Sequence, residues 1–409
     1  MLAPVMGGGG GRWAAIVLCG FAYFAMARNA ASADTTLIPL PEIIVDPNEG
    51  TTVGILPVML IASETKSIST IIAPDVRYND TFGLYPTFRF FDYPDPKQKY
   101  FVMGGKGTLR GEYAEADYQG FDLLDGWLNL SSNVRHEQDP FERFFGFGNH
   151  TPDSNESNYT SSTERGSLLT GLNFYGSFEG FWQTRVSEVR TGRGGVTHLP
   201  QVRDPSSGFS QVNGVTGATT VAQKFGLAFD NRDSYDIPTQ GMYANSTIEV
   251  VDKALGSSDS FIKYGFEGKA FLPLRPDKKL IVALHAALDY LQHGNNAPFY
   301  EKNAVGGIHS LRAYGSGRFR DNNNFVLQGE LRTNVYEREI FGVRAHLEVT
   351  PFVDLAKVFN TSREFPLEDL HPVGGLGFRA VVVPQVVAYV DFGSSGGAPA
   401  VFTGIDYPF

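Results

Sequence analysis

The chain almost lacks cysteine. Its 409 residues contain a single one, Cys19, which lies in an N-terminal segment with the features of a targeting signal. With one thiol the chain cannot form an internal disulfide, and without that segment it has no cysteine nucleophile and no zinc–thiolate site. A cysteine-free exported chain fits a protein that crosses an oxidising compartment before it assembles.

The N-terminal segment predicts export. Arg12 precedes an apolar run over residues 13–27, and Ala31-Ser32-Ala33 offers a small-residue cleavage site. The run is too short to be a convincing transmembrane helix. We therefore predict a secretory signal peptide over residues 1–33.

Two other features are missing from the rest of the chain. No later apolar stretch is long enough for a membrane-spanning helix. Positive charge is not in excess either, because the net charge is −10, and this gives no support for nucleic-acid binding. By contrast, Phe (32), Tyr (18) and Gly (46) are plentiful, as the aromatic girdles and twisted strands of a membrane β-barrel require.

Apolar and polar residues alternate along most of residues 51–409. In one run Val343, Leu347 and Val353 share a face, while Glu348 and Asp354 lie on the other. This period of two predicts strands with one apolar and one charged face. About sixteen such runs are found, near 51–61, 66–79, 82–92, 98–111, 119–137, 157–175, 178–191, 220–231, 240–252, 258–272, 278–291, 322–335, 341–356, 373–383, 385–393 and 399–409.

A soluble β-sandwich shows the same alternation, with its charged face in water. Three features favour a membrane barrel instead: many runs reach ten residues or more, they recur to the last residue, and no helices are predicted to cover the sheet. We predict an all-β fold, a transmembrane antiparallel β-barrel of about sixteen strands over residues 51–409. Residues 34–50, rich in proline, are expected to form a short periplasmic lead-in.

Residues 306–320 interrupt the alternation with a glycine-rich, basic segment that is too long for a tight hairpin. Such a segment is either a mobile surface loop or a loop folded into a polar cavity. Arg312 is its most informative residue, because an arginine fork binds carboxylates through several charge-assisted hydrogen bonds. The alternation places Glu330 and Asp354 on the polar faces of neighbouring strands, so both carboxylates should point into the lumen.

Four segments carry a family resemblance. In chain order they are Phe144-Phe145-Gly146-Phe147-Gly148-Asn149; Asp230-Asn231-Arg232-Asp233 with Pro238 and Gly241; Leu311-Arg312-Ala313-Tyr314; and Phe352-Val353-Asp354-Leu355-Ala356. Together they resemble the barrel domain of the BamA/TamA-type outer-membrane assembly proteins, the bacterial surface antigen family. The resemblance implies that extracellular loop six folds into the lumen, where Arg312 and Tyr314 are tethered by Glu330 and Asp354. It also implies a hairpin motif made by Asp230, Arg232, Asp233 and Gly241.

The chain departs from the family at three places. Ala313 and Ala356 stand where the family has glycine, and alanine would be strained at either position if the backbone needed a positive φ. Residues 34–50 are also too short to hold one of the periplasmic POTRA domains that receive clients in the assembly members of the family. We therefore expect a barrel without POTRA domains.

The final strand is expected to run over residues 399–409, with Tyr407 and Phe409 on its apolar face. An aromatic end of this kind resembles the signal by which the outer-membrane assembly machinery recognises its substrates. The two rings could equally belong to the interfacial aromatic girdle. Both readings place the protein in the bacterial outer membrane.

The resemblance implies a non-enzymatic role in inserting or translocating protein or lipid at the outer membrane. The expected partners are outer-membrane lipid, the assembly machinery during biogenesis, and a protein or lipid client that the sequence does not identify. No cofactor or metal is expected, because the histidines are scattered without ligand spacing. The alternative is a passive pore whose selectivity is set by Arg332, Arg344 and Glu348.

Overall fold

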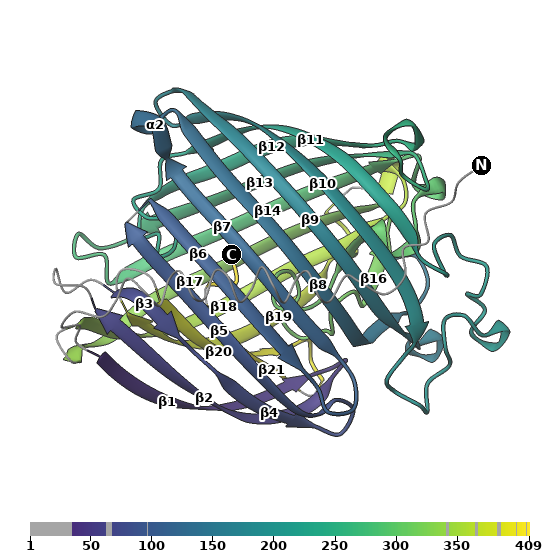
Figure 1. Cartoon of the computed structure of the whole chain (residues 1–409), viewed down its shortest axis with the longest axis horizontal. Helices are drawn as coiled ribbons and strands as arrows, with labels where there is room; N and C mark the ends of the chain where they lie inside the picture. The colour runs from purple at the N-terminus through teal and green to yellow at the C-terminus, as the bar shows by residue number, and fades with distance from the viewer. Residues whose placement is uncertain are drawn as a thin grey trace, which may run out of the picture.

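The computed structural model describes residues 35–62, 68–95, 97–340, 343–364, 367–382, 386–397, 399–405 and 407–409. The predicted signal peptide, residues 1–33, lies outside these ranges. The described chain is almost entirely β-structure (Figure 1). Its α-helical and 3-10 segments are short: α2 (Leu123–Gly126), η1 (Asp153–Asn155), η2 (Pro205–Ser207), η3 (Lys253–Leu255), η4 (Gly294–Asn296), η5 (Phe299–Glu301) and η6 (Ser362–Glu364). No helix in the described ranges is long and apolar enough to cross a membrane.

Nineteen strands form one antiparallel sheet that closes into a barrel. They are β1 (Thr35–Asp46), β2 (Gly50–Ala62), β3 (Ile68–Ile72), β4 (Asp75–Asn79), β5 (Gly83–Asp95), β6 (Gln98–Lys106), β7 (Glu112–Asp122), β8 (Leu128–Phe144), β9 (Ser157–Tyr175), β10 (Phe178–Arg193), β11 (Ala218–Asp230), β12 (Gly241–Val251), β13 (Phe261–Pro273), β14 (Leu280–Gln292), β17 (Asn323–Ile340), β18 (Val343–Phe359), β19 (His371–Val382), β20 (Val386–Ser394) and β21 (Ala400–Ile405). A separate small hairpin pairs β15 (Asn303–Val305) with β16 (Phe319–Asp321). Because β3 and β4 lie end to end between β2 and β5, the barrel has eighteen strand positions.

The barrel is confirmed, but eighteen positions replace the predicted number of about sixteen. One additional strand is β7, which the sequence pattern merged with β8 across a turn that has no proline and has left-handed backbone at Leu124 and Asp125. The other is β1, which overturns the expected lead-in over residues 34–50. Pro39 and Pro41 obscured this strand, yet β1 pairs with β2 along its whole length. Proline is tolerated there because β1 has little pairing on its other side.

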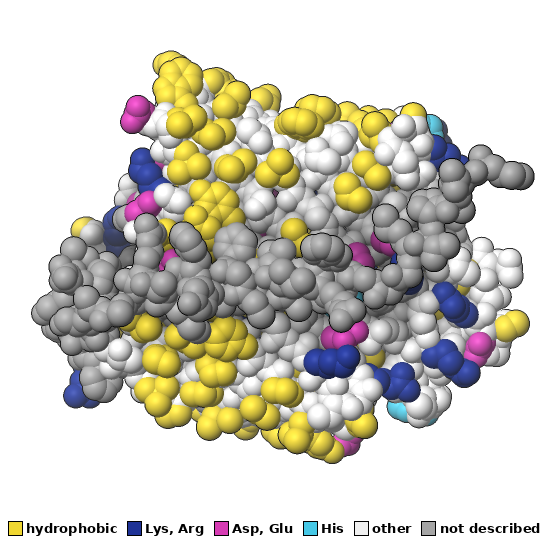
Figure 2. Space-filling model, in the orientation of Figure 1, with side chains coloured by type: hydrophobic (Ala, Val, Ile, Leu, Met, Phe, Trp, Pro, Cys, Tyr) yellow, Lys and Arg dark blue, Asp and Glu magenta, His cyan; other side chains and the backbone are white. Residues whose placement is uncertain are grey.

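The alternation of the strands follows the prediction. Apolar side chains on the outer face are exposed, for example Trp182 (51%), Leu347 (48%) and Val353 (54%), whereas Glu348 and Asp354 are buried on the inner face. Figure 2 shows apolar side chains gathered over the strands, with most charged ones toward the two ends of the barrel. Lipid covers such an outer face, and a closed barrel satisfies the backbone hydrogen bonds that lipid cannot.

The two ends of the barrel carry different connections. At one end the strands are joined by long segments, such as residues 145–156, 194–217 and 293–322, and at the other by short turns, such as 176–177 (Figure 1). Long loops are extracellular and short turns periplasmic in outer-membrane barrels. The segment that joins β14 to β17, residues 293–322, is called loop 6 below.

The wall is weakest where its first and last strands meet. β1 and β2 share twelve register pairs, from Thr35–Ile61 to Asp46–Gly50. Between β1 and β21, by contrast, Val45–Val401 is the one register pair found within the described ranges. The six-residue β21 is half as long as β1, so within the described ranges much of the β1 edge has no strand beside it.

Candidate functional site

Loop 6 folds into the barrel as predicted and carries Arg312 to the inner face of the wall. The guanidinium group of Arg312 is fully buried. It donates from Nε and Nη2 to the two carboxylate oxygens of Asp354 at 2.9 and 2.7 Å, and the Arg312 backbone N–H donates to the same carboxylate at 3.1 Å. Its Nη1 donates to Glu330 at 2.6 Å and to Asp391 at 3.0 Å. The predicted pairing of Arg312 with Glu330 and Asp354 is therefore present.

Two further arginines complete this cluster. Arg379 donates to Glu330 at 2.7 Å and also binds Asp391, while Arg332 donates to Glu330 at 2.9 Å. The cluster around Arg312 thus contains three arginines and three carboxylates, all at most 2% exposed: Arg312, Arg332, Arg379, Glu330, Asp354 and Asp391. Balanced charge and many hydrogen bonds are what allow such groups to be buried.

Sequence reasoning missed Asp391 and Arg379 as members of this cluster. Both lie on the inner faces of predicted strands, β20 and β19, so alternation was the available signal. The missing information was register, because Arg379 faces Tyr389 across the ladder and reaches Asp391 diagonally. Register between strands is fixed by the whole barrel rather than by one strand.

The tip of loop 6 packs closely against the wall. The Arg312 guanidinium carbon lies 3.6 Å from the centre of the Phe352 ring, a cation–π contact. On β20, a Cβ added to Gly393 would lie 1.8 Å from the Arg312 carbonyl oxygen, so only glycine fits there. Ala313 and Ala356 have no positive φ, and alanine is therefore unstrained at both positions.

Tyr314 supports the loop through ring contacts. Its ring meets Phe319 edge to face at 5.3 Å and His371 at 6.1 Å. It also packs on an apolar cluster that includes Leu311 and Val326. The predicted tether therefore has a charged part and an apolar part.

A second anchor holds the other side of loop 6. Glu301 accepts hydrogen bonds from Arg185 on β10 at 3.0 Å and from Lys263 on β13 at 2.7 Å. Arg185 also donates to Glu249 at 2.8 Å. Burial raises the pKa of the Glu301 carboxyl, but the two cations outweigh this and hold the pKa well below its ordinary value. Nothing in the local sequence around Glu301 indicated this role.

The aromatic–glycine segment, Phe144–Asn149, lies against loop 6. The Gly148 N–H donates to the Arg320 carbonyl oxygen at 2.9 Å. Arg318 reaches over the Phe145 ring at 4.2 Å and donates to Asp153 at 2.7 Å. This extracellular segment thus closes over the inserted loop.

The predicted hairpin motif is a turn between β11 and β12, apart from the loop. Arg232 binds Asp230 through Nη2 at 2.6 Å. Asp233 accepts from the backbone N–H groups of Thr239 and Gln240 and from Lys278. Gly241 has a φ of 105°, and a Cβ there would meet the Asn231 carbonyl oxygen at 2.5 Å. The motif shapes this turn and touches none of the loop residues above.

The end of the chain differs from the prediction. The final strand stops at Ile405, and Tyr407, Pro408 and Phe409, called the C-terminal tail below, turn into the lumen. The Tyr407 hydroxyl donates to Glu348 at 3.0 Å, and the Phe409 ring stacks on His285 at 5.2 Å. The Pro408 carbonyl oxygen lies 2.9 Å from His309 Nδ1 of loop 6. Alternation along one strand could not reveal these contacts, because they come from β14, β18 and the loop.

Within the described ranges, no group of three His, Cys, Asp or Glu residues is placed to hold a metal ion. The contacts seen at the site are ion pairs and hydrogen bonds between loop 6 and the barrel wall.

The sequence of the chain matches the model of the Omp85 superfamily domain over residues 122–376, more than half of its length. The chain belongs to the Omp85 superfamily. The resemblance inferred from the four motifs is thereby confirmed. Membership of this Omp85 superfamily implies a bacterial outer-membrane location for the barrel.

Solved structures of other Omp85 proteins are similar to this one. BamA from Haemophilus ducreyi lacking POTRA domains 1–3 matches with a TM-score of 0.53 and 14% identity, over 95% of this chain and 77% of that chain. CdiB from Acinetobacter baumannii matches with a TM-score of 0.49 and 11% identity, over 91% of this chain and 65% of that chain. At these identities the likeness concerns the fold. No curated protein matches the sequence.

Proposed function

We propose that this Omp85 barrel is a non-enzymatic factor that aids insertion or translocation of protein or lipid at the outer membrane. The observation that carries the proposal is the poorly paired seam between β1 and β21. An unpaired strand edge is a template for another strand, and in a bilayer its backbone groups have no water to bind. A client strand could therefore pair with the β1 edge.

The C-terminal tail adds to this argument. Because Tyr407 and Phe409 are held by Glu348 and His285 in the lumen, they do not extend β21 along β1. The contacts of Tyr407 and Phe409 in the lumen thus keep the pairing between β1 and β21 short, although residues follow β21 in the chain. Loop 6 and the tail both occupy the lumen, so passage through the side of the barrel has more support than passage along its axis.

The seam can be locked to test the proposal. Val45 and Val401 are opposed across it, and cysteines at opposed positions of neighbouring strands lie within disulfide range. The variant Val45→Cys/Val401→Cys, with Cys19→Ala, is reconstituted in lipid vesicles, and the folding rate of a urea-denatured outer-membrane barrel is measured. We expect faster client folding with the reduced variant than with empty vesicles, and loss of this acceleration on oxidation.

A matched control separates seam locking from oxidation itself. Phe229→Cys/Ala244→Cys places the same disulfide between β11 and β12, an ordinary strand pair. Acceleration that survives seam oxidation, or that is lost equally in this control, would contradict the proposal.

The alternative of a passive pore has less support. Two of its predicted selectivity residues are buried and bonded: Arg332 to Glu330, and Glu348 to Tyr407. The third, Arg344, has a side chain outside the described part of the structure.

A further inference from the structure

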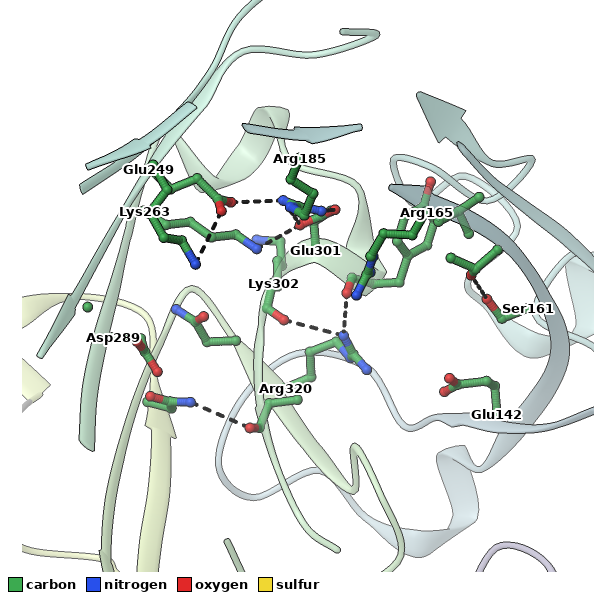
Figure 3. A pocket seen from close by; sticks show the side chains of 18 of the residues that line it. Glu142, Ser161, Arg165, Arg185, Glu249, Lys263, Asp289, Glu301, Lys302 and Arg320 are labelled. Atoms are coloured by element: carbon green, nitrogen blue, oxygen red, sulfur yellow. Dashed lines mark hydrogen bonds and ion pairs between the residues drawn. The ribbon is translucent and has the colours of Figure 1, made fainter. Parts of the chain in front are cut away.

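A cavity of about 610 Å³ lies between loop 6 and the wall formed by β8 to β14 (Figure 3). Its lining contains seven Lys or Arg residues and five Asp or Glu residues: Arg135, Arg165, Arg185, Lys224, Lys263, Lys302 and Arg320, with Glu137, Glu142, Glu249, Asp289 and Glu301. The cavity is therefore positive, whereas the whole chain has a net charge of −10.

Most of these acids form ion pairs with neighbouring cations. Glu301 and Glu249 bind Arg185, and they also bind Lys263 and Lys224, respectively. Glu137 pairs with Arg135. Among the described residues, Arg165, Lys302 and Arg320 form no ion pair with any carboxylate. The Lys302 ammonium donates to Asn322 and lies over the Phe147 ring, so Arg320 from loop 6 and Arg165 from β9 are the two cations left for the cavity.

The hydrogen-bond donors of the cavity are also incompletely used. The Nε atoms of Arg135, Arg165 and Arg320 are buried and have no partner in the described part of the chain. Arg320 uses Nη1 for the carbonyl oxygens of Phe299, Tyr300 and Lys302. Buried donors are normally satisfied, so three such atoms around one cavity leave it with donors free for an acceptor.

The strand register supports the same conclusion. Arg135 on β8 and Arg165 on β9 are directly opposed across the ladder. Like charges at opposed positions destabilise a sheet, and among the described residues Glu137 pairs with Arg135 but not with Arg165. Figure 3 shows Arg165 and Arg320 reaching into the cavity from the wall and from the loop.

We propose that this cavity is a binding site for a compact oxyanion ligand of the phosphate class, held by Arg165 and Arg320 with Arg135 beside them. Arginine forks and lysine ammonium groups are the usual partners of phosphate oxygens. The bound anion would connect the β9 wall to loop 6 and so add to the anchoring of the loop. This inference goes beyond the proposed assembly role and does not depend on it.

The test uses the full barrel refolded in a phosphate-free detergent, titrated with inorganic pyrophosphate by calorimetry. We expect saturable binding at one site per chain, and a loss of affinity of about tenfold in Arg165→Gln, since one charge-assisted contact is removed. Within the described ranges the Arg165 side chain has no hydrogen-bond or ion-pair partner to lose, so this variant should fold as the wild type does. Arg135→Gln is the second variant and should weaken binding in the same direction.

Arg193→Gln is the matched control, because Arg193 is an exposed arginine outside the cavity. It should leave pyrophosphate affinity unchanged. The ligand can be a free phosphate-type anion or the headgroup of a lipid, and titration with dihexanoyl phosphatidate distinguishes the two. Equal affinity of both probes per phosphate group would identify the ligand as a free anion. Tighter binding of the lipid would identify it as a lipid headgroup. Absence of saturable binding of either probe, or equal binding by wild type and both cavity variants, would overturn the proposal.

Discussion

Loop 6 is held against two walls of opposite character. On the wall of β17 to β20, Arg312 enters a cluster in which three arginines and three carboxylates balance, and every member is buried. On the wall of β8 to β14, Glu301 binds Arg185 and Lys263, but beside it remains a cavity where, among the described residues, Arg165 and Arg320 form no ion pair. The first wall therefore fixes the loop, whereas the second both holds it and leaves room for a ligand.

The largest effect is expected from Arg312→Ala. Removing this cation leaves Asp354, Glu330 and Asp391 buried with too few donors, and breaking a buried ion pair in this way costs about 3–5 kcal/mol. Urea unfolding in lipid vesicles measures the loss of unfolding free energy. Arg312→Lys keeps the charge but not the fork, and should fall between wild type and alanine.

A smaller loss is expected from Glu301→Gln. Lys263 loses its carboxylate partner, but Arg185 keeps Glu249, so the unfolding free energy should fall by about 2 kcal/mol. The same urea experiment applies. A loss equal to that of Arg312→Ala would remove the distinction between the two walls.

The fit of the loop tip is tested by Gly393→Ala. The added Cβ would overlap the Arg312 carbonyl oxygen, and overpacking of this kind costs about 1–3 kcal/mol. Gly374→Ala is the control on the neighbouring strand β19, where a Cβ meets nothing within 4 Å. If the two variants unfold alike, loop 6 does not lie against β20 as described.

The smallest effect concerns the hairpin motif outside the loop. Burial raises the pKa of Asp233, but hydrogen bonds from Thr239 and Gln240 and the ion pair with Lys278 lower it from 3.8 to about 2. The carboxylate therefore stabilises the fold above about pH 4, and this contribution is lost as the pH falls toward about 2. Because the group is partly exposed, the contribution is at most about 1 kcal/mol.

Asp233→Asn checks this expectation. The difference in unfolding free energy between variant and wild type should be present at about pH 6 and absent at about pH 2. A difference that is independent of pH would show that the carboxylate charge plays no part.

The sequence predicted those features that depend on local pattern. Alternation placed Glu330 and Asp354 in the lumen, and the loop motif supplied their partner, Arg312. It could not place Glu301, because the role of this residue depends on cations from β10 and β13 that come together only when the barrel closes. Tyr407 and Phe409 were assigned to a strand for the same reason, since Glu348 and His285 draw them inward across the lumen.

The sequence prediction missed β1 for a different reason. Pro39 and Pro41 argue against a central strand, but they are acceptable in a strand with one poorly paired edge. Pro39 and Pro41, which made β1 hard to predict, therefore lie in the strand that forms one side of the weak seam, and the proposed function rests on that seam.

Loop 6, anchored on both walls, is expected to block the lumen. The most direct measurement is single-channel conductance of the refolded barrel in planar bilayers, with wild type compared to Arg312→Ala. We expect a low, flickering conductance for wild type and a changed, larger one for the variant. A large, steady conductance that is indifferent to Arg312 would contradict this expectation.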